Sequence, residues 1–198
     1  MPKRDSRPGD VIESIEPDEA LDILRRLAED PSIRKRVEDL ARERLSDVDV
    51  EGVADRVYEE LDMIDVHDLW ESSGSTRHGY VDVTDRAWDM FDEALEPVRG
   101  EMERYRGLSM RREETVVLMG MLKGLHDYEE GSTSEFKDWA VDAPHDRFRS
   151  LLEEWREGRD DPEESREMEE FLQRETPGWS GELRGGEHPA NEPASPVE

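Results

Sequence analysis

The chain has 198 residues, of which 54 are acidic and 27 are basic, so its net charge is −27 at pH 7. It contains no cysteine, which excludes disulfides and thiolate metal sites, and no apolar run approaches the roughly 20 residues that span a bilayer. Nonspecific binding to nucleic acids or anionic membranes is disfavoured, because both are polyanions. These properties predict a cytoplasmic protein that has no membrane partner and does not favour nucleic acid.

Hydrophobic periodicity predicts helices along most of the chain and almost no strand. After a flexible lead-in over residues 1–16, we expect helices near 17–30, 31–45, 49–63, 84–105, 111–128, 144–155 and 161–174, and a short helical segment near 136–140. The helix over 161–174 has few apolar residues and is expected to be weak and peripheral. We therefore predict an all-α fold of six to seven antiparallel helices, forming a compact bundle or a short α-solenoid. The expected organisation is a domain over 17–160, the peripheral helix 161–174 and a disordered acidic tail over 175–198.

The first two predicted helices each carry an apolar stripe at 3.6-residue spacing and meet at Asp30-Pro31. Their sequence, LDILRRLAEDPSIRKRVEDLARERL, resembles one HEAT-type repeat unit, in which an Asp-Pro turn often joins the two helices. The resemblance implies a helical hairpin at the N-terminal end of the domain.

Two later helices carry further local signals. Thr84 is a suitable N-cap for the helix over 84–105, and Pro97 predicts a kink within it. The helix over 111–128 is apolar nearly all round, which is typical of a central, enclosed helix. Gly120 and Gly124 lie one turn apart on it, and we expect them to allow a neighbouring backbone to pack closely.

Three of the five histidines are followed directly by aspartate. The His126-Asp127 pair, at the end of an apolar helix, resembles the metal-binding core of the all-helical HD-domain phosphohydrolases. The resemblance implies a divalent metal that activates water, held with one upstream and one downstream ligand. The upstream candidates are His67 and His78, and the downstream candidates are Asp138, Asp142 and Asp146. Aspartate is so abundant here that His-Asp pairs are expected by chance. We therefore expect no metal, cofactor or catalytic residues, and keep the metal site at His126 and Asp127 as the alternative.

The loop over 72–80 places Arg77 and His78 between acidic helices. Backbone N–H groups near Gly74 and Gly79 could hold an anion beside Arg77, although the loop lacks the terminal Lys-Ser/Thr of a phosphate-binding loop. The alternative is a plain connection in which Arg77 pairs with nearby acids and the aromatic residues Trp70 and Tyr80 fill the core.

Residues 25–44 hold seven basic and five acidic residues and form the one locally positive stretch. The candidate contacts with an acidic partner or a nucleic-acid backbone are Arg34, Arg36, Arg42 and Arg44. The alternative is a ladder of ion pairs four residues apart, such as Arg34 with Glu38, that neutralise one another. In the polar tail, Trp179 is of the residue type that anchors partners, and it is equally suited to fold back on its own domain.

The acid excess and the scarcity of lysine, four against twenty-three arginines, resemble proteins of salt-in halophiles, haloarchaea above all. No sequence motif names a reaction. We therefore expect a non-enzymatic helical interaction module or adaptor that binds another protein in a high-salt cytoplasm. This hypothesis predicts a contiguous exposed apolar patch. The alternatives are an HD-like metal-dependent phosphohydrolase and a regulator that contacts nucleic acid through residues 25–44.

Overall fold

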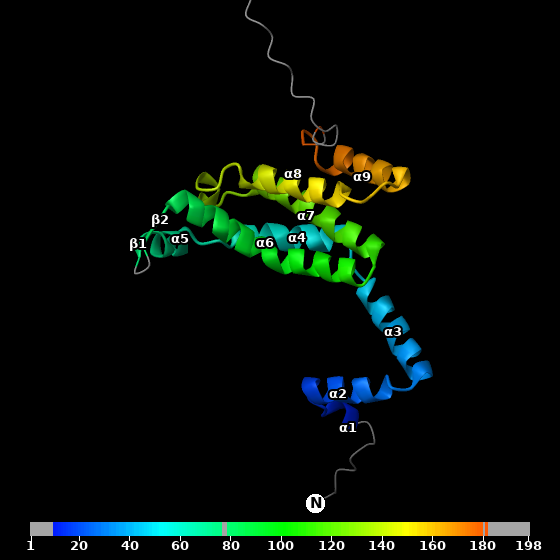
Figure 1. Ribbon diagram of the computed structural model, residues 1–198. Coiled ribbons are helices and arrows are strands. Elements are labelled where there is room, and N and C mark those ends of the chain that lie inside the picture. The colour runs from blue at the N-terminus through cyan, green and yellow to red at the C-terminus, as the bar shows by residue number, and fades with distance from the viewer. Residues whose placement is uncertain (1–9, 77–78, 180, 182–198) are drawn as a thin grey trace, which may run out of the picture. The chain divides into compact units, whose positions relative to one another are not determined.

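The computed structural model describes residues 10–76, 79–179 and 181, and most of these residues are helical (Figure 1). The predicted all-α class is thereby confirmed. Contacts divide the chain into two units, 1–47 and 48–198. The sequence, in contrast, predicts one domain over 17–160. In the described residues, no helix is long and apolar enough to cross a membrane.

The N-terminal unit contains α1 (Asp10–Glu13), α2 (Pro17–Leu27) and α3 (Pro31–Leu45). The short helix α1 lies in the segment expected to be a flexible lead-in. Helix α3 begins where the sequence predicts, because the Asp30 carboxylate accepts hydrogen bonds from the backbone N–H groups of Ser32 at 2.8 Å and Ile33 at 3.2 Å. Although α2 and α3 both carry apolar stripes, neither helix buries a residue in the described part of the chain.

The second unit, called the helical domain below, contains the remaining elements. They are α4 (Val50–Asp62), α5 (Val66–Ser72), β1 (Gly74–Thr76), β2 (Gly79–Val81), α6 (Val83–Gly107), α7 (Arg111–Gly131), the 3-10 helix η1 (Glu135–Asp138), α8 (Ala143–Arg156) and α9 (Pro162–Glu175). The two strands pair antiparallel, with Ser75 opposite Tyr80. Helix α6 is capped by Asp82, whose carboxylate accepts from the backbone N–H of Thr84 at 2.9 Å, so the prediction of Thr84 as the cap is wrong.

Helix α7 is the centre of the helical domain, as its apolar sequence predicts. It contacts α4 and α6 on one side and α8 and α9 on the other (Figure 1). At Gly120, a methyl group would lie 2.6 Å from Cγ1 of Val53 and 2.9 Å from the carbonyl oxygen of Val50. At Gly124 it would lie 2.7 Å from the carbonyl oxygen of Ala54. The two glycines therefore let α4 pack directly on the α7 backbone, which confirms the predicted close approach.

Candidate functional site

The four candidate arginines of α3 do not form one basic face. Successive residues of an α-helix are rotated by about 100°, which spreads Arg34, Arg36, Arg42 and Arg44 around the helix with about 80° or more between neighbours. The side chain of Arg34 donates to the carbonyl oxygen of Ala28 at 2.8 Å, and that of Arg44 pairs with Asp47 at 2.9 Å. The expected ladder of pairs four residues apart is not formed among the described residues either. This arrangement gives no support to nucleic-acid contact through residues 25–44.

The candidates Arg77 and His78 lie outside the described residues. The strands on either side of them form the β1–β2 hairpin, which the sequence predicts only as a loop. The expectation that Trp70 and Tyr80 fill the core is wrong. Tyr80 is 75% exposed and Trp70 is 52% exposed.

Among the described residues, none of the other candidate ligands comes together with His126 and Asp127 in a group that could hold a metal. His126 is buried on α7, where Nε2 lies 3.4 Å from the carbonyl oxygen of Pro177 and Nδ1 lies 3.6 Å from Asp127. Asp127 pairs with Lys123 at 2.6 Å, which raises the pKa of the lysine. His67 is the upstream candidate that the structure describes, and it pairs with Glu71 on the surface of α5. The described part of the chain contains no group of three or more His, Asp or Glu side chains placed to hold a metal.

Trp179 lies against its own domain. Its ring meets those of His126, His145 and Phe148 edge-on, with ring centroids 5.0 to 5.3 Å apart. The C-terminal segment thereby joins α7 to α8, and Thr176 within it is fully buried. The sequence allowed two positions for Trp179, as an anchor for a partner or folded back on its own domain. In the structure it is folded back.

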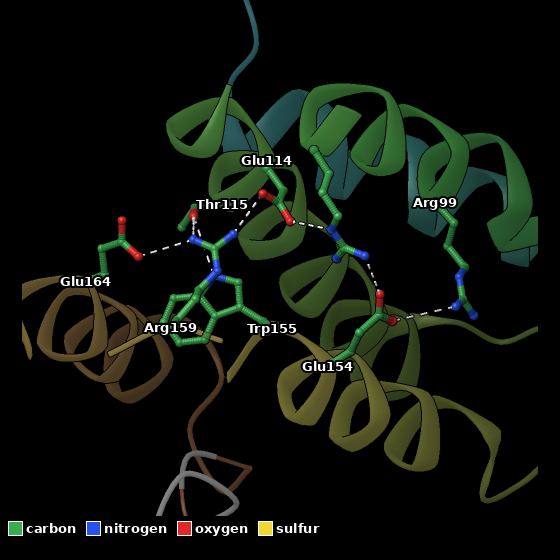
Figure 2. Close-up of polar contacts among 8 residues, drawn as sticks. Arg99, Glu114, Thr115, Glu154, Trp155, Arg159 and Glu164 are labelled. Carbon is green, nitrogen blue, oxygen red and sulfur yellow. Dashed lines mark hydrogen bonds and ion pairs between the residues drawn. The ribbon is translucent and has the colours of Figure 1, made fainter. Parts of the chain in front are cut away.

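The most extensive polar cluster of the helical domain is an ion-pair network between α6, α7, α8 and α9 (Figure 2). Arg159, between α8 and α9, pairs with Glu114 of α7 at 2.8 Å, and the side chains of both are largely buried, at 7% and 6% exposed. Glu114 also pairs with Arg106 of α6 at 2.8 Å, and Arg106 with Glu154 of α8 at 2.8 Å. These hydrogen bonds to Glu114 and Glu154 raise the pKa of Arg106.

Three further contacts hold the buried guanidinium of Arg159 in place. It lies 3.2 Å from Oγ1 of Thr115 and 3.2 Å from Glu164, and it sits 5.2 Å from the ring centroid of Trp155 (Figure 2). Each buried charge of the network thus faces an opposite charge, as burial requires. The network borders a surface hollow of about 290 Å³, but its charges are already matched to each other, so we interpret it as a structural connection between the helices.

A second cluster is aromatic and partly exposed, and we call it the tryptophan surface. It consists of Trp70 on α5 and Trp139 just after η1, whose rings meet edge-on with centroids 4.7 Å apart. The neighbouring Val141 is also exposed. Each tryptophan lies beside a fully buried residue: Leu69 precedes Trp70 on α5, and the carbonyl oxygen of Phe136 in η1 accepts a hydrogen bond from the backbone N–H of Trp139 at 3.0 Å. The pair therefore stands on anchored elements although Trp70 is half exposed.

The residues that flank the two tryptophans in the sequence include exposed carboxylates, which are Asp65, Asp68, Glu71, Asp138 and Asp142. Near these rings, negative charge and an electron-rich aromatic face favour a cation. The sequence alone does not reveal this pair, because Trp70 follows an apolar pattern that predicts burial and Trp139 lies far away in the sequence.

Comparison of the chain with protein-family models, with curated proteins and with solved structures finds no match.

Proposed function

We propose that this protein is a non-enzymatic interaction module whose helical domain binds another protein through the tryptophan surface. The observation that carries the proposal is the half-exposed Trp70, packed edge-on against Trp139. Tryptophan is among the residue types that dominate binding energy when a partner covers them. An anchored aromatic pair also loses little conformational freedom on binding.

The carboxylates that flank the two tryptophans in the sequence indicate the chemistry of the partner. We expect a protein segment that places an apolar residue on the tryptophan pair and a lysine or arginine beside it. The basic side chain would gain from the carboxylates of α5 and from the face of Trp70. We propose a high-salt cytoplasm as the setting, supported by the forty-one acidic and seventeen basic residues of 48–198. Salt at multimolar concentration screens the repulsion among these excess carboxylates.

Selection from a phage-displayed random peptide library tests the proposal with the full chain as bait. We expect enriched peptides to combine an aromatic or aliphatic residue with lysine or arginine. For a peptide selected in this way, Trp70→Ala should weaken binding by about 2 kcal/mol, which is roughly 30-fold. Leu108→Ala is the matched control, because Leu108 is an exposed apolar residue at the C-terminal cap of α6, and it should leave binding unchanged. Selected peptides without basic residues, or equal binding to both variants, would refute the proposed function.

A further inference from the structure

The two rings of the tryptophan surface meet like the walls of a corner. The planes of Trp70 and Trp139 are inclined at 81°, and the ring centroids are 4.7 Å apart. In such an edge-on contact the edge of one ring covers only part of the face of the other, and 52% of Trp70 stays exposed. The face of an aromatic ring carries negative electrostatic potential. A cation in the corner therefore meets two attractive faces at once.

Other tryptophans of this chain already hold cations on their rings. The guanidinium of Arg147 lies 5.0 Å from the ring centroid of Trp88, and that of Arg159 lies 5.2 Å from the ring centroid of Trp155. Within the part of the chain that the structure describes, no lysine or arginine lies over either ring of the tryptophan surface. The corner thus offers ring faces of the kind that the chain's own arginines occupy elsewhere.

The sequence around both tryptophans is acidic and lacks basic residues. Residues 57–76 contain six acidic residues and no lysine or arginine, and residues 138–146 contain three acidic residues and again no lysine or arginine. Glu71 directly follows Trp70 and pairs at 3.3 Å with His67, which is charged only when protonated. Asp138 directly precedes Trp139. This excess of negative charge favours a partner that brings a cation to the corner.

The right-angled arrangement of the rings distinguishes between cations. A guanidinium is planar and lies flat on one ring face at a time. An ammonium group is compact and tetrahedral, so it can contact two perpendicular faces together. An unmodified ammonium is strongly hydrated and gives up hydrogen bonds to water when it enters such a corner. Methylation of a lysine keeps its charge and replaces N–H donors with methyl groups, so a methylated ammonium enters at lower cost.

We propose that the corner between Trp70 and Trp139 binds the basic residue of the partner protein, and that this residue is a lysine methylated on its ammonium group. This inference rests on the proposed function, because it specifies the basic residue that the tryptophan surface is expected to bind. The two ring faces and the neighbouring carboxylates hold the cation. The apolar residue of the partner packs beside it, on the remaining exposed ring surface and on Val141, which is 62% exposed.

Tetramethylammonium is the simplest probe of the corner, because it carries the charge and the methyl groups without a peptide. Nuclear magnetic resonance of the full chain resolves the indole N–H signals of the five tryptophans, which single Trp→Phe variants assign. We expect saturable shifts of the Trp70 and Trp139 signals. The signals of Trp88 and Trp155 should not move, because arginines of the chain occupy those rings. Equal shifts of all five signals, or no shift of the pair, would overturn the proposal.

A comparison of charged and uncharged peptides, at one KCl concentration, tests the partner residue. Isothermal titration calorimetry is performed with a peptide that the tryptophan surface binds, carrying either trimethyllysine or its analogue in which a carbon atom replaces the quaternary nitrogen. The two side chains have the same shape, and only the first is charged. We expect the charged peptide to bind about fivefold more tightly, and also more tightly than peptides with unmodified lysine or arginine at that position. Equal binding of the charged and uncharged peptides would rule out the cation site.

Two variants of Trp139 separate the ring face from apolar contact. Trp139→Leu keeps an apolar side chain but removes the second ring, and it should abolish most of the preference for the charged peptide. Trp139→Phe is the matched control and should retain the preference, because it keeps an aromatic face. Circular dichroism checks that both variants fold, which we expect because Trp139 is partly exposed just after η1. A full preference in Trp139→Leu would contradict the two-walled corner.

The cation site and the proposed function can fail separately. Peptides that bind through Trp70 without any preference for the charged side chain would leave the interaction module in place and reject the cation site. Tetramethylammonium binding at the corner, without any peptide selected by the full chain, would support the cation site and reject the protein partner.

Discussion

Replacing Gly120 with alanine tests the close approach of α4 to α7. The new methyl group would lie 2.6 Å from Cγ1 of Val53 and 2.9 Å from the carbonyl oxygen of Val50. Both distances are well below the 3.5 to 4.0 Å of an ordinary carbon contact. Rotation of the valine side chain moves Cγ1 but not Cβ, which lies nearer still, and the carbonyl oxygen belongs to the backbone of α4. The substitution must therefore move one helix away from the other.

Gly100→Ala in α6 is the matched control, because a methyl group at this exposed helical position would meet no atom within 4 Å. Alanine favours the helix over glycine by about 1 kcal/mol at either position. This gain cancels in the comparison, so the difference between the two variants measures the overpacking. Overpacking of a core costs about 1–3 kcal/mol, and we expect the upper half of that range because a backbone atom is involved.

Thermal and denaturant unfolding followed by circular dichroism, in the same KCl concentration for both variants, provide the measurement. Each 1 kcal/mol corresponds to about 2–4 °C in Tm for a chain of this size. We expect Gly100→Ala to be slightly more stable than the unsubstituted protein and Gly120→Ala to be less stable. If both variants gained stability equally, α4 would not pack on the α7 backbone as the structure shows.

Four further substitutions test the packing and ion pairs of the helical domain. Glu114→Gln should lower the free energy of unfolding by about 3 kcal/mol, because it leaves the buried charge of Arg159 without its closest partner. Glu164→Gln, at the more exposed end of the same network, should cost less than about 1 kcal/mol, and equal costs in urea unfolding would argue against a buried network. Trp179→Ala should lower stability by about 1 kcal/mol and increase hydrogen exchange in the segment after α9, because it removes three edge-on ring contacts; unchanged exchange would show that the segment does not dock. Tyr128→Phe should leave stability unchanged or raise it by up to about 1 kcal/mol, because the buried hydroxyl has no hydrogen-bond partner among the described residues, and a clear loss of stability would reveal a partner for it.

The helices that the sequence predicts well are those whose signals are local. Asp30-Pro31 supplies the cap and the first residue of α3, and Asp161-Pro162 does the same for α9. The central position of α7 follows from its apolar sequence, and Gly120 marks where a neighbour comes closest. Each of these signals acts within a few residues, so one sequence contains all the information that it requires.

The polar and aromatic clusters could not be predicted in the same way, because they depend on long-range contacts. Arg159 and Glu114 come from distant parts of the chain, and nothing near either residue identifies its partner. The error at Trp70 has a different cause. Helix α5 is only seven residues long, and the adjacent Leu69 takes the buried position, which turns Trp70 toward the surface. A shift of one residue position, about 100° around a short helix, decides whether Leu69 or Trp70 faces the core. Hydrophobic periodicity is too coarse to resolve such a shift.

Helix α2 shows what an amphipathic pattern does and does not determine. The spacing of Leu21, Leu24 and Leu27 predicts an apolar face and therefore a surface that covers it, but it does not state which chain supplies that surface. In the described residues α3 does not supply it, since neither helix buries a residue.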